Sequence, residues 1–381
     1  MSIIGHVGVA LTLDVLWLIN DVRIANPVWK PLTLQNTLLP AGIIHLKLKL
    51  PMTNREISEN QTLLTIKDLK VHFPIREGLF GRPSRFIKAV DGVSFEVGYG
   101  ETFGLVGESG CGKSTVGNAI LRLIEPTSGQ IEFCGEEMTS RNKPLLQSHR
   151  RHMQIIFQDP MSSLNPRMKV GESVGEPLYV HEHLKGKKLQ KAVEKLFDIV
   201  GIQKNCFNRY PHEFSGGQRQ RLVVARALSL NPKFIVCDEP VSALDVSIQS
   251  QILNLLVDLQ KEMGLAYLFI SHDLSVVRHI SDRVAVQYLG KIVEITTNSR
   301  LFETPLHPYT IALMAAIPIA DPVVQRQRQK QVLSGDLPSP ENPPPGCAFH
   351  SRCPNCQAVC VSESPQLKRV GPDHLAACHF I

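Results

Sequence analysis

The sequence of 381 residues contains no apolar run long enough for a convincing membrane span. The stretch that comes closest, Ile3 to Ile19, is interrupted by His6 and Asp14. It also lacks the basic first region and the small-residue cleavage site of a secretory signal. We therefore expect that, if the protein works at a membrane, other subunits provide the spans.

A strong charge imbalance is also missing. The chain has 41 Lys and Arg residues against 35 Asp and Glu residues, a net charge of +6. This mild excess suits an acidic ligand such as a nucleotide, or an anionic membrane surface, although a slightly basic soluble protein would carry it without either. We expect no nucleic-acid partner. The length allows a large core and two or three domains.

Internal repeats are absent, and after the first 60 residues the chain alternates strand-like and helix-like stretches. A charged, mainly helical stretch runs from about Gly171 to Leu230, and the apolar residues from Ile248 to Met263 keep helical spacing. Strands that alternate with helices predict an α/β fold with a largely parallel sheet. The predicted strands are Leu63–Ile66 continuing through Leu69–Phe73, then Ala89–Val97, a run that ends at Leu105 and Val106, Phe234–Asp238 and Tyr267–Ile270.

A phosphate-binding loop lies between a predicted strand and a predicted helix. Residues 107–114 read G-E-S-G-C-G-K-S, a full G-x-x-x-x-G-K-[ST] motif, and the helix follows from Thr115. Glycines let backbone N–H groups crowd round phosphates, and the helix N-terminus adds positive potential. We expect Lys113 to reach the β- and γ-phosphates of ATP and Ser114 to hold Mg²⁺. The predicted ATP-binding residues of the loop are Gly107, Ser109, Gly110, Cys111, Gly112, Lys113, Ser114 and Thr115.

Two acidic residues end the predicted strand Phe234–Asp238. Asp238 and Glu239 would stand at the carboxyl edge of the sheet, where ligands bind in open α/β folds. We expect Asp238 to hold Mg²⁺ through water, and Glu239 to polarise the attacking water. An apolar run that ends in Asp-Glu is common by itself. Together with the phosphate loop upstream, it predicts the Mg²⁺ and water site of an ATPase.

The order of these and further motifs resembles the ATP-binding cassette (ABC) proteins. Phe214–Gln218 is similar to the signature loop of that family, with Ser215, Gly216, Gly217 and Gln218 as its binding residues. The remaining matches are single residues in family motifs. They are the Q-loop glutamine Gln158, the D-loop Asp245, the switch histidine His272 and the adenine-stacking aromatic Phe73.

This resemblance covers roughly residues 62–381 and implies a fold and a division into segments. The implied fold is a RecA-like P-loop NTPase with an antiparallel β subdomain, a helical signature subdomain and a small cysteine-rich C-terminal extension. The ATPase domain would span 62–318, with its helical subdomain at about 159–232. An N-terminal extension would span 1–61, and the C-terminal extension 319–381.

Several further stretches are similar to one branch, the ATPase subunits of oligopeptide and dipeptide permeases, and most of all to the "F" ATPase. They are Ser162–Arg167, Leu306–Thr310, Leu337–Pro340 and the cysteine tail from Gly346. The resemblance implies a peripheral ATPase at the cytoplasmic face of the membrane. Its implied partners are a homologous "D" ATPase, two membrane-spanning permease subunits and, indirectly, a peptide-binding protein.

The family mechanism that the resemblance implies uses two cassettes that pair head to tail. Ser215 and the N–H groups of Gly216 and Gly217 would bind the γ-phosphate held by the other subunit. Gln158 would sense the γ-phosphate and contribute to the Mg²⁺ site, and it would couple the site to the membrane subunits. Glu239, His272 and Gln158 are thus the predicted catalytic residues.

Other functions remain open on the sequence alone. One rival is a soluble cassette protein in translation or DNA repair, although such proteins usually carry two cassettes or long coiled-coil insertions. Another is a nucleotide-binding regulatory subunit without hydrolysis, which Glu239 and His272 argue against. The cargo of an importer could be dipeptides, longer peptides or nickel.

The last 35 residues contain five of the nine cysteines. Cys347, Cys353, Cys360 and Cys378 match the four tail cysteines of the permease family, and four thiolates suit a [4Fe–4S] cluster or Zn²⁺. Cys356 is a rival ligand, because it forms C-x-x-C with Cys353. Free buried thiols are the third interpretation.

The first 51 residues do not resemble the family, and Met52 opens a polar stretch typical of a cassette N-terminus. We expect translation to begin at Met52, so that the upstream residues come from a misassigned start. An additional anchor at the membrane surface is the alternative, because exposed apolar residues would need cover.

Overall fold

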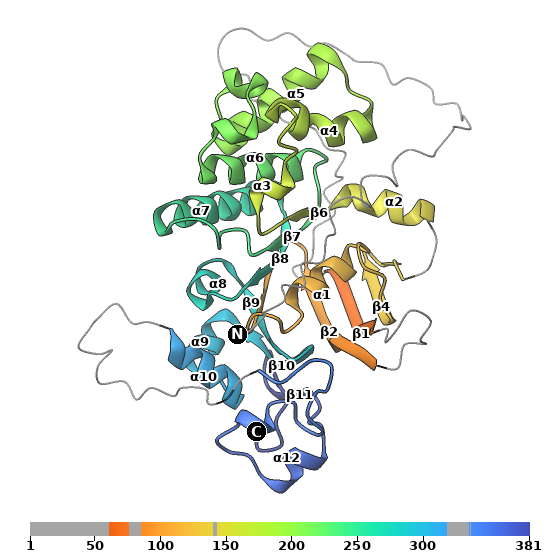
Figure 1. The fold of residues 1–381 in the computed structure, drawn as a ribbon, viewed down its shortest axis with the longest axis vertical. Coiled ribbons are helices and arrows are strands. Elements are labelled where there is room, and N and C mark those ends of the chain that lie inside the picture. Colours follow the sequence, from red (N-terminus) through yellow and green to blue (C-terminus); the bar gives the residue numbers. More distant parts are fainter. Residues whose placement is uncertain (1–60, 76–84, 140–142, 318–334, 336) are drawn as a thin grey trace, which may run out of the picture. The chain divides into compact units, whose positions relative to one another are not determined.

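The computed structural model describes residues 61–75, 85–139, 143–317, 335 and 337–381. These residues fold around two sheets with helices packed against them, as the α/β prediction required (Figure 1). Residues 1–60 of the predicted N-terminal extension, with the predicted start at Met52, and residues 318–334 and 336 lie outside the described residues.

The central sheet has eight strands in the order β11-β12-β10-β9-β3-β8-β7-β6. Its parallel part comprises β9, β3, β8, β7 and β6, whereas β10, β12 and β11 pair antiparallel at one side. Strands β3, β7 and β8 are buried at every residue, which is why they read as continuous apolar runs. The strands are β3 (Thr102–Val106), β6 (Met153–Ile156), β7 (Phe234–Asp238), β8 (Ala266–Ser271), β9 (Arg283–Tyr288), β10 (Lys291–Thr297), β11 (Lys368–Gly371) and β12 (His374–Ala376).

A second, antiparallel sheet has the order β2-β1-β4-β5. The two predicted strands near residues 63–73 form one long strand, β1 (Thr62–Ile75), which pairs with β2 (Arg85–Gly98) and β4 (Ser128–Phe133). The short β5 (Glu136–Glu137) completes the sheet. Helix α1 (Lys113–Ile120) shares one hydrophobic core with this sheet and with β7 and β8, so the helix that follows the phosphate loop joins both sheets.

A helical region lies between β6 and β7 in the chain and forms one end of the molecule in Figure 1. Its helices pack on α6 through buried residues such as Val174, Phe197 and Leu222. The elements of this region run from Pro160 to Leu228, whereas the predicted helical subdomain spans about 159–232. The elements of this region are α3 (Pro160–Ser163), α4 (Val170–Glu182), α5 (Gly186–Val200), η2 (Lys204–Asn208), η3 (Pro211–Glu213) and α6 (Gly216–Leu228).

The remaining helices lie outside this helical region of the chain, and none in the described part is long and apolar enough to cross a membrane. They are α2 (Lys143–His152), α7 (Val246–Met263), α8 (Leu274–Ile280), α9 (Asn298–Glu303), α10 (Pro308–Ala316), η4 (His350–Arg352) and α12 (Ala358–Ser362). The C-terminal extension is attached to the central sheet, because β12 pairs with β10 from Glu294 to Thr296.

Candidate active site

The loop between β3 and α1 depends on glycine at two positions. Gly112 has φ 100°, and a Cβ there would lie 1.9 Å from the carbonyl oxygen of Ala89. A Cβ on Gly107 would lie 2.2 Å from the carbonyl oxygen of Gln287. Both positions therefore exclude any side chain, because the loop passes directly against β2 and β9.

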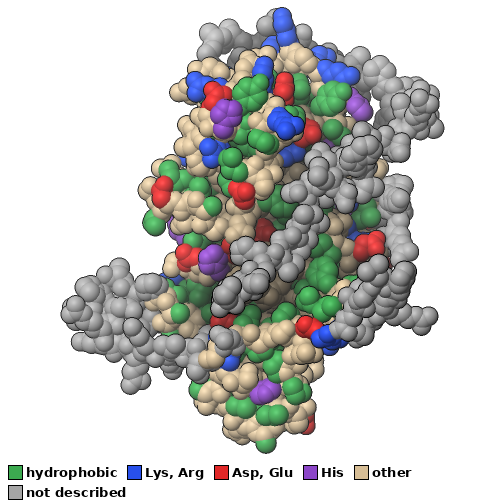
Figure 2. Space-filling view, viewed as in Figure 1, with side chains coloured by type: hydrophobic (Ala, Val, Ile, Leu, Met, Phe, Trp, Pro, Cys, Tyr) green, Lys and Arg blue, Asp and Glu red, His purple; other side chains and the backbone are tan. Residues whose placement is uncertain are grey.

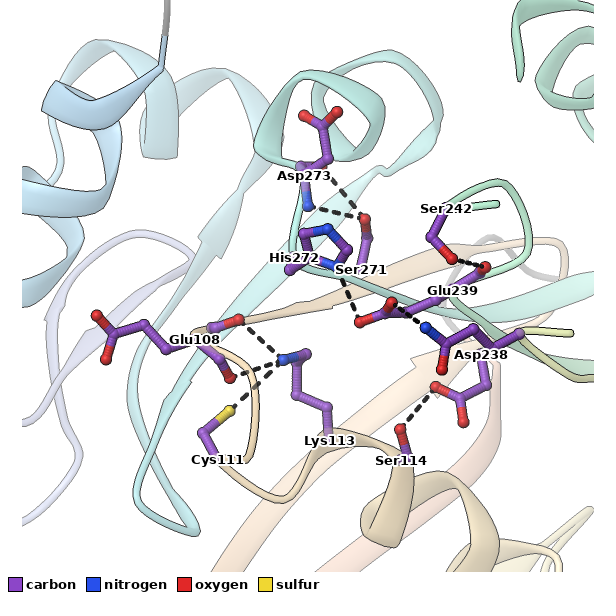
Figure 3. Close-up of polar contacts among 12 residues, drawn as sticks. Glu108, Cys111, Lys113, Ser114, Asp238, Glu239, Ser242, Ser271, His272 and Asp273 are labelled. Carbon is purple, nitrogen blue, oxygen red and sulfur yellow. Dashed lines mark hydrogen bonds and ion pairs between the residues drawn. The ribbon is translucent and has the colours of Figure 1, made fainter. Parts of the chain in front are cut away.

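Lys113 begins α1 and turns its ammonium group back into this loop (Figure 3). Its Nζ donates hydrogen bonds to the carbonyl oxygens of Gly107 at 2.8 Å and Glu108 at 2.9 Å. The side chain is buried with 5% exposure, so the loop holds one cation among backbone dipoles. A buried cation beside a helix N-terminus attracts anions, and a polyphosphate fits that arrangement.

Ser114 and Asp238, two of the residues predicted to hold Mg²⁺, meet at the sheet edge. The Ser114 hydroxyl donates to Oδ1 of Asp238 at 2.8 Å. Burial raises the pKa of Asp238, and the hydrogen bond from Ser114 opposes that rise. A buried carboxylate is costly to leave charged without a partner. Together with the hydroxyl of Ser114 it offers two hard oxygen ligands, which suit Mg²⁺.

Glu239 and His272 also meet, at the ends of neighbouring strands β7 and β8 (Figure 3). Nδ1 of His272 lies 2.9 Å from Oε1 of Glu239, and Nε2 of Gln158 donates to Oε2 at 3.0 Å. Glu239 has φ 47°, held by a hydrogen bond from its N–H to the carbonyl of Ile270. The three predicted catalytic side chains thus form one contact group. Gln158 contacts Glu239 here, whereas the sequence also assigned it to Mg²⁺.

The signature residues form the start of α6 and do not join this group. Ser215 caps the helix, accepting from the Gln218 N–H at 3.4 Å, while Oε1 of Gln218 accepts from the Ser215 N–H at 3.1 Å. Gly217 packs on α7, where a Cβ would lie 2.5 Å from Cγ2 of Ile248. Ser215 and Gly216 are exposed, and Figure 1 shows α6 and α1 in separate parts of the molecule.

Asp245 and Phe73, the predicted D-loop and adenine-stacking residues, lie at the ends of two elements. Asp245 caps α7 by accepting from the Ile248 N–H at 3.0 Å, and its hydrogen bond from Ser247 is the main cause of its lowered pKa. Phe73 lies near the end of β1 opposite Ile87 and is 37% exposed. A large aromatic ring exposed at a strand end is available for stacking on a flat ligand.

Comparison with known proteins agrees with this geometry. The family profile "ABC transporter" matches residues 90–242, and the profile "Oligopeptide/dipeptide transporter, C-terminal region" matches residues 293–360. The oligopeptide transport ATP-binding protein AppF of Bacillus subtilis is 51% identical over 324 residues, covering 85% of this chain and 98% of its own length.

The chain belongs to the ABC transporter ATPases of the oligopeptide/dipeptide branch. Two further relatives support this assignment. The oligopeptide transport ATP-binding protein OppF of Salmonella typhimurium is 52% identical, covering 83% of this chain and 95% of the relative. The dipeptide transport ATP-binding protein DppF of Escherichia coli is 48% identical, covering 87% and 98%.

Solved structures of ABC proteins confirm the fold. The cassette MJ0796, in a dimeric post-hydrolysis state bound to ADP and Pi, matches with a TM-score of 0.55 and 27% identity over 62% of this chain and 99% of that one. The cbiO1 protein of Clostridium perfringens, part of the transporter complex cbiONQ, matches with a TM-score of 0.56 and 27% identity. That match covers 64% of this chain and 92% of the other.

The four tail cysteines that match the permease family line one cavity of this ABC ATPase. Cys347, Cys353, Cys360 and Cys378 line one cavity of about 130 Å³, and the exposed Cys356 does not. Within the described residues, no group of three or more His, Cys, Asp or Glu is arranged to hold a metal ion. Burial is the main cause of the raised pKa of the Cys347 and Cys353 thiols, which favours their protonated forms.

Several residues that support the phosphate loop were not predicted. Nε2 of Gln287 and the N–H of Gly290 both donate to the carbonyl of Cys111, at 2.8 and 2.9 Å. The hydroxyl of Tyr309 accepts from the N–H of Glu108 at 2.9 Å. Tyr309 belongs to a stretch that the sequence singled out as typical of the branch, but no spacing rule connects it with the loop.

Proposed function

We propose that this ABC ATPase is the ATP-hydrolysing subunit of a multi-subunit importer that takes up oligopeptides or dipeptides. The observation that carries the proposal is the presence of both matched regions in one chain, the cassette at 90–242 and the transporter C-terminal region at 293–360. The second region lies outside the cassette match and is described as part of oligopeptide/dipeptide transporters. Its occurrence in relatives named for oligopeptide and dipeptide transport favours peptides over nickel.

The proposed partners are a homologous "D" ATPase, two membrane-spanning permease subunits and, indirectly, a peptide-binding protein. The chain would act peripherally, at the cytoplasmic face of the membrane. No helix within the described residues could span the membrane, which fits a subunit that relies on the permease subunits for the membrane-spanning path.

Nucleotide binding is assigned to the phosphate loop and to Phe73, which would stack on adenine. Lys113 and the loop N–H groups would contact the β- and γ-phosphates, and Ser114, Asp238 and Gln158 would hold Mg²⁺. Bound there, Mg²⁺ would neutralise charge that develops on the phosphate oxygens. The 2.8 Å contact between Ser114 and Asp238 supports this assignment, because both ligands already face one point.

Hydrolysis is assigned to Glu239, His272 and Gln158. Glu239 would orient the attacking water and accept its proton, while His272 and Gln158 hold the carboxylate through the contacts at 2.9 and 3.0 Å. His272 is half-exposed, which leaves its ring free to follow the γ-phosphate when a nucleotide is present.

A second cassette would complete the site. The exposed start of α6, with Ser215, Gly216, Gly217 and Gln218, would bind the γ-phosphate held by the partner, and Asp245 would lie near the same interface. Two facts support the head-to-tail pairing: α6 lies apart from α1 within the chain, and the structural neighbour MJ0796 is a nucleotide-bound dimer (Figure 1).

We also propose that the four tail cysteines take up a [4Fe–4S] cluster or Zn²⁺. Their shared cavity supports this, although the thiols would have to move together and lose their protons first. Iron, sulfide and zinc content after anaerobic purification is the test. Protein free of all three elements would leave only the free-thiol interpretation.

Co-purification tests the proposed function as a whole. An affinity tag on this chain should bring down one homologous ATPase and two polytopic membrane proteins from solubilised membranes. Recovery with ribosomes or DNA-repair factors would instead favour a soluble cassette protein. Binding of ATP without any hydrolysis by the purified complex would favour a regulatory subunit.

A further inference from the structure

The C-terminal extension contacts the phosphate loop directly, through a pair of charged residues far apart in the sequence. Arg352, the last residue of η4, donates from Nη1 to Oε2 of Glu108 at 2.7 Å and from Nη2 to Oε1 at 3.0 Å. Both oxygens of the carboxylate are therefore engaged by one guanidinium, the strong two-pronged form of this ion pair. Glu108 is the second residue of the phosphate loop.

This ion pair is not an ordinary surface contact. The Arg352 side chain is 6% exposed and that of Glu108 is 26% exposed. The guanidinium lies 6.0 Å from the centroid of the Tyr288 ring, and Tyr288 packs against Tyr309 and Phe349 with centroids 4.7 and 5.3 Å away. Because water is largely excluded, loss of one partner would leave the other charge poorly solvated.

The charge of Glu108 gives the pair a specific consequence for nucleotide binding. A carboxylate in a loop that binds a polyphosphate carries the same sign of charge as its ligand. Figure 3 shows the Glu108 carboxylate turned away from Lys113, while its carbonyl oxygen faces the ammonium group. Arg352 neutralises that carboxylate and holds it on the outer side of the loop.

Tyr309 fixes the backbone of the same residue. Its hydroxyl accepts from the N–H of Glu108 at 2.9 Å, and its ring is fully buried in the aromatic cluster. Glu108 is thus held at its backbone by α10 and at its side chain by the extension. The conformation of the loop beside Lys113 depends on both elements.

The turn that carries Arg352 borders the cavity lined by the four cysteines, through His350 and Cys353. The η4 turn runs between Cys347 and Cys353, and its backbone is tied by the His350 N–H to the Cys347 carbonyl at 3.0 Å. The Cys353 N–H donates to the His350 carbonyl at 3.3 Å, and the Cys347 N–H donates to the Cys360 carbonyl at 2.8 Å. The turn that carries Arg352 is therefore part of the wall of that pocket.

We propose that Arg352 is a positioning residue of the ATP site, which sets ATP affinity by neutralising Glu108 and holding it away from the phosphates. The cysteine-rich extension then forms part of the nucleotide-binding apparatus. This inference rests on the proposed function of the phosphate loop, and the experiment separates the two.

The test is a double-mutant cycle in the full-length chain within its purified complex. Arg352→Gln, Glu108→Gln and the double variant are compared by KM for ATP, kcat and Tm. Arg352→Gln should raise the KM roughly ten-fold with kcat little changed, the range expected for two coupled residues in contact. In the Glu108→Gln background the same arginine change should raise the KM at least about three-fold less.

Two control variants sharpen the result. Arg369→Gln removes an exposed arginine from β11 of the same extension, and its KM should match that of the unaltered protein. Arg352→Lys keeps the charge without the two-pronged geometry and should fall between Arg352→Gln and the unaltered protein. Lys113→Ala is assayed in parallel, and normal ATP affinity in that variant would overturn the proposed function instead.

Each of the following outcomes contradicts the proposal. An unchanged KM in Arg352→Gln removes its basis. A KM effect of equal size with and without Glu108 would make Arg352 a packing residue only. If Arg352→Gln does not fold, the double variant and Arg352→Lys decide the matter. The role of charge is overturned if the double variant stays unfolded or keeps the raised KM. It is also overturned if the KM of the Arg352→Lys variant is as high as that of Arg352→Gln.

Discussion

Replacing Glu239 with glutamine should separate ATP binding from hydrolysis. The carboxylate accepts from Nδ1 of His272 at 2.9 Å and from Nε2 of Gln158 at 3.0 Å. A glutamine has the same shape but offers only one acceptor oxygen, so one of the two donors would face another donor. That local mismatch costs roughly 1 kcal/mol, which lowers the Tm by only about 2–4 °C in a chain of this size.

The effect on turnover should be much larger. Loss of the group that accepts the proton of the attacking water should lower kcat at least ~10²-fold, which corresponds to about 2.7 kcal/mol in the activation barrier. ATP affinity should stay nearly unchanged, because the phosphate loop and the contact between Ser114 and Asp238 are untouched. The variant should therefore accumulate as an ATP-bound pair with its partner ATPase.

The assay is phosphate release and equilibrium ATP binding by the purified complex. The glutamate of the partner ATPase that corresponds to Glu239 is replaced in both arms, so that all turnover comes from the site of this chain. Glu262→Gln, an exposed glutamate on α7, is the matched control and should hydrolyse at the normal rate. Normal turnover by the Glu239→Gln variant would refute the assignment of the catalytic base.

Four other results are expected. Lys113→Ala should weaken ATP binding at least about ten-fold by equilibrium titration, since it removes the buried cation of the loop. Gly217→Ala should lower the Tm by several degrees and impair dimer-dependent turnover, because its Cβ would lie 2.5 Å from Ile248. Burial lowers the pKa of His307 to about 4. Between pH 6.5 and 4 the unfolded chain therefore binds more protons at this residue than the folded chain does, and the free energy of unfolding should fall as the pH drops through that window. The loss approaches about 3 kcal/mol, and His307→Asn, which can still cap α10, should flatten this part of the urea-unfolding profile. Replacing Cys347, Cys353, Cys360 or Cys378 with serine should abolish any bound iron or zinc in elemental analysis, whereas Cys356→Ser should not.

The sequence was sufficient to predict the parts of the site that follow from local pattern. Strand β7 was readable because it is a buried apolar run that ends in Asp238, and β3 leads directly into a motif whose glycines exclude side chains. The carboxyl edge of a parallel sheet then brings Ser114 to Asp238 and Glu239 to His272. These contacts needed only the order of the strands.

Contacts set by tertiary packing could not be predicted in this way. Arg352 and Glu108 are separated by 244 positions, and neither lies in a pattern that points to the other. The hydroxyl of Tyr309 reaches the same loop only because α10 packs beside it. For the cysteine tail, the family resemblance singled out four thiols, and the structure shows that these four line one cavity whereas Cys356 does not. The spacing of the cysteines alone could not predict this, because spacing carries no information about how the chain folds around them.

Peptide uptake by the assembled importer tests the central claim most directly. Vesicles containing the complex, its peptide-binding protein and a labelled oligopeptide are supplied with ATP and Mg²⁺ on the side where this chain is bound. We predict ATP-dependent transfer of the peptide from the vesicle interior to the side where this chain is bound. This transfer should disappear when Glu239→Gln is introduced together with the matching change in the partner ATPase. Peptide transfer that is independent of ATP, or transfer that persists in the doubly altered complex, would contradict the account.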